Sequence, residues 1–111
     1  MMRKLIVSIL FLTIITSCNK DKRRFTVTDF SKVRIDTLVP YEHKTYTGFI
    51  VRVKGYVNDT IKIKREGYYD INFSGKVDTL LNSDYYGTYD VICLFDPYKA
   101  TEGKLKIEYS L

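Results

Sequence analysis

Apolar and polar residues alternate along most of the chain after about residue 25. In the stretch 104–111, Leu105, Ile107 and Tyr109 share one parity, while charged and small polar residues take the other. A strand has this two-residue period because successive side chains point to opposite faces of a sheet. No long stretch has the 3.6-residue period of an amphipathic helix. The pattern therefore predicts an all-β fold.

The alternating stretches divide into short predicted strands separated by turn-forming residues, with Asn58-Asp59 read as a two-residue hairpin loop. The strands are expected at 25–28, 32–38, 46–57, 60–64, 68–73, 76–81, 88–95 and 104–111. Short antiparallel strands with turn signals at intervals of about eight to twelve residues are typical of an immunoglobulin-like β-sandwich of about seven to eight strands. A small β-barrel is the alternative.

Residues 1–18 follow a different pattern. Arg3 and Lys4 precede an apolar run, 5–15, and small residues follow it. A helix over this run would be about 16 Å long, against about 30 Å for the hydrocarbon core of a bilayer. A basic start, an apolar run and small residues are the three parts of an export signal. The alternative, a buried helix or strand, fits the extreme N-terminal position and the basic flank less well.

The residues Ile15-Thr16-Ser17-Cys18 resemble the lipobox of bacterial lipoproteins. The resemblance implies that signal peptidase II cleaves between Ser17 and Cys18. It also implies that Cys18 carries a diacylglyceryl group and an amide-linked acyl chain such as palmitate. Two or more acyl chains anchor a protein stably, whereas one binds marginally. By this resemblance the protein is anchored in a bacterial cell envelope, on the periplasmic or surface face of the outer membrane.

A lipobox followed by an immunoglobulin-like domain is also similar to small envelope lipoproteins of Bacteroidetes. The chain is then divided into a signal peptide (1–17), a lipidated cysteine with its tether (18–24) and a β-sandwich domain (25–111). Loss of Arg3 and Lys4 with the signal lowers the formal charge from +5 to +3. Four basic residues stand against one acid in the tether, Lys20, Lys22, Arg23 and Arg24 against Asp21, and a solvated linker or attraction to anionic lipid headgroups explains them. Nucleic-acid binding is not expected.

The sequence has few of the residues that catalysis or metal binding needs. The one histidine, His43, lies in a predicted loop without a nucleophile motif. Cys93 lies in an apolar run, and the only other cysteine is Cys18, so no disulfide framework is expected. Acidic residues recur every six positions without the pattern of a calcium loop: Asp78, Asp84, Asp90 and Asp96. We expect no enzymatic activity, no metal and no cofactor.

Tyrosine is the most suggestive residue type. The stretch 82–89 reads Asn-Ser-Asp-Tyr-Tyr-Gly-Thr-Tyr, which is the composition of a recognition loop. Tyrosine offers a large amphipathic contact surface, and its neighbours offer adaptable hydrogen bonds. The candidate binding residues are Asp84, Tyr85, Tyr86 and Tyr89. The alternative is that these rings cover the edge of the core with their hydroxyls in water.

These features predict a lipid-anchored envelope protein that acts as a non-catalytic protein-binding module. An assembly subunit and an inhibitor of the immunity type both fit this description. Two alternatives stay open. A surface glycan-binding lipoprotein would stack sugars on the same tyrosines, although the absence of Trp counts against it. A structural envelope protein would have no specific ligand.

Overall fold

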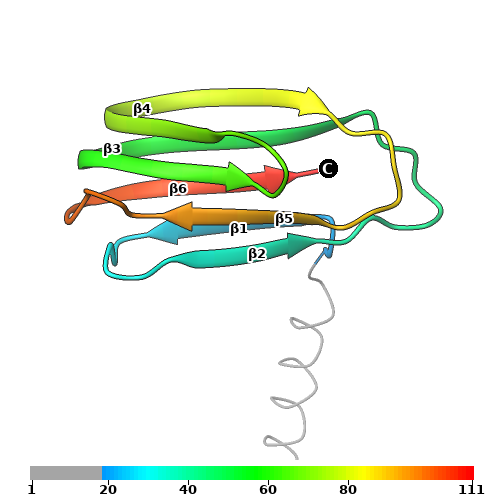
Figure 1. The fold of residues 1–111 in the computed structure, drawn as a ribbon, viewed down its shortest axis with the longest axis horizontal. Coiled ribbons are helices and arrows are strands. Elements are labelled where there is room, and N and C mark those ends of the chain that lie inside the picture. Colours follow the sequence, from blue (N-terminus) through cyan, green and yellow to red (C-terminus); the bar gives the residue numbers. More distant parts are fainter. Residues whose placement is uncertain (1–18) are drawn as a thin grey trace, which may run out of the picture.

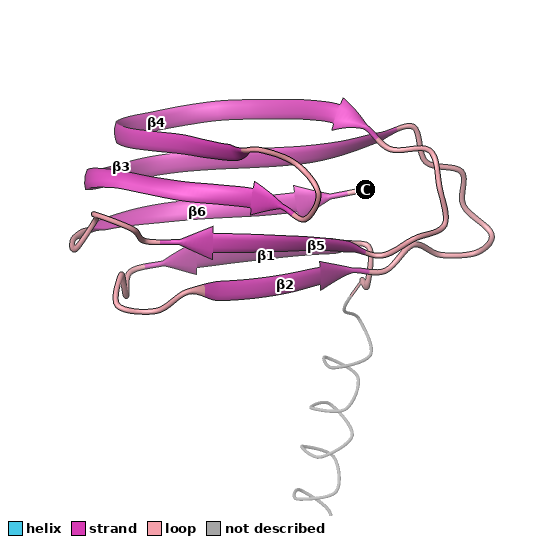
Figure 2. Ribbon diagram, viewed as in Figure 1, coloured by secondary structure: helices cyan, strands magenta, loops and turns pink. Residues whose placement is uncertain are grey.

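A computed structural model describes residues 19–111, which form six antiparallel strands and no helix (Figure 2). The predicted signal peptide, with the cleavage and lipidation residues Ser17 and Cys18, lies outside the described residues. The strands are β1 (Lys22–Val27), β2 (Arg34–Leu38), β3 (Gly48–Arg65), β4 (Asp70–Asp84), β5 (Val91–Asp96) and β6 (Gly103–Ser110). The prediction of an antiparallel all-β fold is confirmed.

β3 and β4 form one long hairpin that bends in the middle and folds back on itself (Figure 1). Its pairing is broken only between Val57 and Ile61. We call 48–57 and 75–84 the base arms of the hairpin, and 61–65 and 70–73 its tip arms. Each of the two strands therefore contributes one segment to each of two layers.

The two layers have four segments each. One layer contains β1, β6 and the base arms, and the other contains β2, β5 and the tip arms. Numbered along the chain, the segments are β1 (1), β2 (2), 48–57 (3), 61–65 (4), 70–73 (5), 75–84 (6), β5 (7) and β6 (8). Their order in space is 1-8-3-6 in the first layer and 2-7-4-5 in the second. These are the orders of a jelly roll, a sandwich built from two Greek keys. β1 and β2 lie beside each other at the side opposite the hairpin, so the sheet nearly closes as a barrel does (Figure 1).

The eight predicted strands correspond to these eight segments, but Asn58-Asp59 is not a hairpin loop. It is the bend at which β3 crosses from one layer to the other. The side-chain oxygen of Asn58 accepts hydrogen bonds from the backbone N–H groups of Thr101 and Glu102, at 2.9 and 3.1 Å. The bend is thus tied to the β5–β6 connection, because Asn58 bonds across the fold and not along its own strand.

The core lies between the layers and follows the predicted alternation. Phe49, Val51 and Val53 of β3 are buried, as are Leu105 and Ile107 of β6. The outward residues between them are mostly charged. No helix in the described part of the chain is long and apolar enough to cross a membrane.

The β domain begins before residue 25, so the predicted tether over 18–24 is wrong for its second half. β1 starts at Lys22 and pairs in register with β6 from Lys22↔Ser110 to Val27↔Leu105. Asp21 is 1% exposed. Charged side chains suggested a solvated linker, but Lys22 and Arg24 point outward while their backbone groups bond to β6. Charge on an edge strand is compatible with pairing and discourages pairing with other chains.

Candidate functional site

An apolar groove lies between the base arms and the tip arms of the β3–β4 hairpin. Its volume is about 320 Å³, within the range of small ligand sites. Phe49, Val51 and Leu81 line it from the base arms, and Ile63 and Ile71 line it from the tip arms. We call it the hairpin groove.

The groove stays open because β4 pairs only with β3. Among residues 19–111 no further strand covers the outer edge of β4, so several of the side chains that it turns inward are only partly enclosed. Ile71 is 38% exposed, and Leu81 is half-buried. An exposed apolar edge of this kind is where a sheet protein meets another molecule most readily.

Arg65 lies at the inner wall of the hairpin groove and is 7% exposed. Its Nη1 donates to the Ser83 hydroxyl and to the Asp84 carbonyl oxygen, both at 3.3 Å. Its Nη2 donates to the Tyr89 hydroxyl at 3.2 Å. The charge therefore has neutral hydrogen-bond partners on β4 and on the loop that follows it.

Aromatic rings surround the Arg65 guanidinium. Its central carbon lies 4.1 Å from the ring centroid of Tyr68 and 5.1 Å from that of Phe49. A cation over a ring face is attracted by the negative potential there, and the attraction strengthens when water is excluded. The rings thus hold the charge in place without neutralising it.

Tyr85 is a core residue, so the prediction that it contacts a ligand is wrong. Its side chain is 1% exposed, and its hydroxyl donates to the Tyr89 carbonyl oxygen at 2.6 Å. Its ring lies 6.0 Å from that of Tyr46. The alternation of β4 continues beyond its last residue, so that Tyr85 has the inward parity of Val77 and Leu81. Burial, chiefly, raises the pKa of the Tyr85 hydroxyl above its usual value.

The rest of the predicted loop remains at the surface. Tyr86 and Tyr89 are 72% and 52% exposed, and Asp84 is exposed. Tyr89 and Asp84 both accept hydrogen bonds from Arg65. The loop therefore adjoins the hairpin groove, which the sequence did not predict.

Two further exposed tyrosines, Tyr68 and Tyr69, lie in the turn between the tip arms and line the same groove. We call Tyr68 and Tyr69, which line the groove, together with Tyr86 and Tyr89 of the adjoining loop, the tyrosine rim. Sequence reasoning missed the first two and Arg65, which it assigned to a turn. The sequence does indicate that the Arg65 side chain points inward, because Arg65 has the same parity as the inward residues Ile61 and Ile63.

The described residues contain no group of three His, Cys, Asp or Glu side chains that could hold a metal ion. Cys93 is buried opposite Asp36 and Arg65 in the register of its layer. Burial, chiefly, and the Asp36 charge raise the pKa of this thiol to about 12, while Arg65 opposes the shift. Cys93 is therefore a protonated core residue and not a nucleophile. His43 is exposed in the loop before β3.

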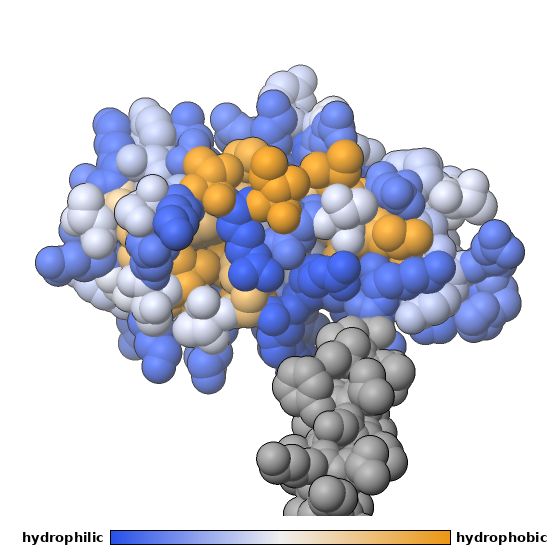
Figure 3. Space-filling model, turned by 90° about the horizontal axis from the view of Figure 1, so that it is seen from below, coloured by the Kyte–Doolittle hydropathy of each residue, from blue (hydrophilic) through white to orange (hydrophobic). Residues whose placement is uncertain are grey.

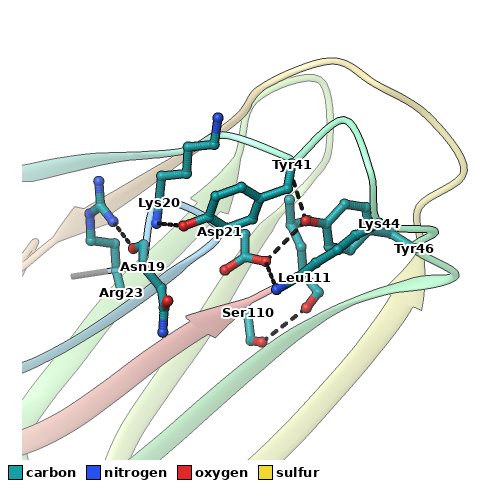
Figure 4. A network of polar contacts seen from close by, with 9 residues as sticks. All are labelled: Asn19, Lys20, Asp21, Arg23, Tyr41, Lys44, Tyr46, Ser110 and Leu111. Carbon is teal, nitrogen blue, oxygen red and sulfur yellow. Dashed lines mark hydrogen bonds and ion pairs between the residues drawn. The ribbon is translucent and has the colours of Figure 1, made fainter. Parts of the chain in front are cut away.

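A polar network fastens the start of the described chain to the loop before β3 (Figure 4). One oxygen of Asp21 accepts a hydrogen bond from the Tyr46 hydroxyl at 3.0 Å and lies 3.4 Å from Lys44 Nζ. The Tyr41 ring lies between two cations, with Lys20 Nζ 4.7 Å and Lys44 Nζ 4.8 Å from its centroid. This network ties residues 20–21 to the loop before β3 at the end of the domain that carries residue 19.

A second apolar surface lies where β1 and β2 run side by side. Figure 3 shows apolar side chains gathered on this side of the molecule. Val33 and Ile35 are its most exposed members, at 53% and 64%. The buried carboxylate of β2, Asp36, is already paired with Arg34 at 2.7 Å, so this surface has less of the character of a specific site than the hairpin groove.

Comparisons with protein-family models, with curated proteins and with solved structures gave no match to this chain. The class of protein is therefore defined here by its fold alone: a small jelly-roll domain with an apolar groove and a tyrosine rim at its open edge.

Proposed function

We propose that this chain is a lipid-anchored protein of the bacterial cell envelope whose jelly-roll domain binds another protein without catalysis. The observation that carries the proposal is the hairpin groove with its tyrosine rim. Interfaces between proteins are enriched in Tyr and Arg around an apolar centre, and the groove combines all three.

The lipobox supports the anchor, because Ile15-Thr16-Ser17-Cys18 has the residue types that lipoprotein processing requires. Under this proposal the chain acts either as an assembly subunit or as an immunity-type inhibitor. A Cys18→Ser variant is expected to lose labelled palmitate and to leave the membrane fraction. Retention of both the label and the membrane location would contradict the anchor.

The binding site is tested by capture from a solubilised envelope and secreted fraction, with enriched proteins identified by mass spectrometry. We expect one protein to be enriched by the parent chain and lost with the double variant Tyr86→Ala/Tyr89→Ala. Tyr56→Ala is the matched control, because Tyr56 is 55% exposed on β3 and belongs neither to the groove nor to the loop that adjoins it.

Equal enrichment by parent and double variant would remove the rim from the proposal. If no protein is enriched but a polysaccharide binds the parent and not the double variant, the partner is a glycan. The mostly apolar lining of the groove favours a protein over a sugar, since sugar sites need polar groups that meet many hydroxyls.

A further inference from the structure

Arg65 carries a buried positive charge without a counter-ion. It is 7% exposed, and no carboxylate among residues 19–111 lies within 4.0 Å of its nitrogen atoms. Its acceptors are two hydroxyls and one carbonyl oxygen, and its Nε–H has no acceptor in this part of the chain. Arginine has five N–H donors in a fixed fork, so part of the fork is unused.

The surroundings are also positive. Lys64 lines the hairpin groove together with Arg65, whereas no Asp or Glu side chain lines it. An unpaired buried charge is costly, and a carboxylate is the partner that fits the guanidinium fork with two parallel hydrogen bonds. The charge of the groove is thus complementary to a carboxylate.

The remainder of the groove is apolar and small. A ligand of suitable size must therefore present a carboxylate and an apolar group close together. A polypeptide C-terminus that ends in an apolar residue does this, because its carboxylate and its side chain are attached to the same Cα. An internal segment would have to bring these two groups from different residues and pass through a volume of about 320 Å³.

We infer that the partner places its C-terminal residue in the hairpin groove, with the carboxylate on Arg65 and an apolar side chain against Val51, Ile71 and Leu81. This inference rests on the proposed function and names the part of the partner that is bound. The tyrosine rim then contacts the residues that precede the C-terminus.

The inference is tested with two probes that differ only in their terminal group, a carboxylate in N-acetylphenylalanine and a neutral amide in N-acetylphenylalaninamide. Binding to the full chain in detergent micelles is followed by the Nε–H resonance of Arg65 in nitrogen-15 NMR spectra. We expect the carboxylate probe to bind at least about tenfold more tightly than the amide and to shift the Nε–H resonance, because charge-assisted hydrogen bonds are made only by the carboxylate. Equal affinities would overturn the inference.

Variants give an independent comparison. Arg65→Gln is expected to abolish the preference for the carboxylate probe, whereas Arg52→Gln, on the exposed face of the same strand, is expected to keep it. A preference retained in Arg65→Gln would assign the carboxylate to another residue and overturn the inference. If Arg65→Gln does not fold, the comparison of the two probes on the parent chain still decides.

Hexanoate separates a polypeptide terminus from a fatty acid. If hexanoate binds more tightly than N-acetylphenylalanine, the occupant is a lipid and the inference is wrong. The proposed function fails differently: it fails when the parent chain enriches no protein. Capture that depends on the rim but survives in Arg65→Gln would keep the proposed function and overturn the inference alone.

Discussion

Adjacent residues of one type have opposite roles in this protein. Tyr85 is buried and bonds to the Tyr89 carbonyl oxygen, while Tyr86 is 72% exposed. The difference follows from parity alone, since neighbouring residues of an extended chain point to opposite faces. From the composition of the loop alone, both tyrosines would be predicted to contact a partner.

The two tyrosines should therefore respond differently to substitution. We expect Tyr85→Ala to lower the free energy of unfolding by about 3–5 kcal/mol, because it leaves a large cavity in the core. Tyr85→Phe should cost only about 1 kcal/mol, the net value of its hydrogen bond. Urea unfolding of the chain from Asn19 measures both.

Tyr86→Ala is the matched comparison and should change the free energy of unfolding by no more than about 0.5 kcal/mol. A similar loss for Tyr86→Ala and Tyr85→Ala would show that the two side chains share the core, contrary to the structure.

Cys93 offers a second test at this scale. Because burial raises the pKa of its thiol to about 12, almost none of it is thiolate at pH 8. In the chain from Asn19, where it is the only cysteine, we expect a disulfide reagent to label it only as fast as the protein unfolds. Rapid labelling in the absence of urea would mean that the thiol is accessible in the native state.

Among the elements, β1 departs most from its sequence character. Four of the five residues from Lys20 to Arg24 are basic, yet β1 is paired along its whole length with β6. It also covers the core, since the Phe25 ring lies 5.6 Å from that of Tyr109. Backbone hydrogen bonds to β6 and the packing of Phe25 and Val27 against the core keep it in the fold, despite its basic residues.

A chain that starts at Phe25 should therefore be less stable than one that starts at Asn19. It loses the pairs that Lys22, Arg23 and Arg24 make with β6, together with the bond between Asp21 and Tyr46. With about 1 kcal/mol for each hydrogen bond lost, we expect a loss of about 3 kcal/mol in the free energy of unfolding.

Thermal unfolding followed by circular dichroism checks this difference. The control is Lys22→Gln/Arg24→Gln in the longer chain, which removes charge but keeps the strand and should cost less than about 1 kcal/mol. Equal stability of the two chain lengths would restore the tether interpretation.

Gly55 of β3 and Gly103 of β6 allow these two strands to approach closely. A Cβ added at Gly55 would lie 2.0 Å from the Lys104 carbonyl oxygen, and the φ angle of Gly55 is 143°. Gly55→Ala should therefore cost more than about 2 kcal/mol, because backbone must move. Gly67 has a φ angle of 86°, but a Cβ added there would meet nothing within 4 Å. Gly67→Ala should therefore cost about 1–2 kcal/mol, from backbone strain alone. Comparison of the urea midpoints of the two variants separates the steric clash at Gly55 from the strain at Gly67.

For the whole molecule, alternation determined which face of each strand is buried but not which strands are neighbours. Arg65 and Leu81 have inward parity in the sequence, and their burial could have been predicted. That they line one groove depends on the bend at Asn58 and on the pairing of β5 with one arm of β3 and β6 with the other. These contacts join residues far apart in the chain, and no local pattern encodes them.

One cysteine and three tyrosines have a raised pKa in the folded domain, and this makes the stability of the whole domain sensitive to alkaline pH. Burial raises the pKa of Cys93 to about 12 and also raises the pKa of Tyr46, Tyr85 and Tyr109. In the unfolded chain a cysteine ionises near pH 8.5 and a tyrosine near pH 10. Above these values the unfolded state binds fewer protons than the folded state, so stability falls as pH rises.

We therefore expect the free energy of unfolding to decrease from about pH 8.5 to pH 12, as measured by urea titrations at several pH values. Cys93→Ala is expected to be less stable at neutral pH and to show a flatter decrease between about pH 8.5 and pH 9.5, where the thiol contributes more than the tyrosines. An unchanged slope in that range would assign the loss to another group.

The burial of Asp21 limits how far the domain can move from a membrane. With lipid on Cys18, as proposed, only Asn19 and Lys20 separate the anchor from buried Asp21, and the three Cα–Cα steps from Cys18 to Asp21 span at most about 10 Å. Tyr46 contacts both Asp21 and Tyr85, so the tyrosine loop is at the anchored end. A domain held this close to the lipid diffuses in two dimensions along the membrane, and it meets only partners whose own binding segment lies at the lipid surface.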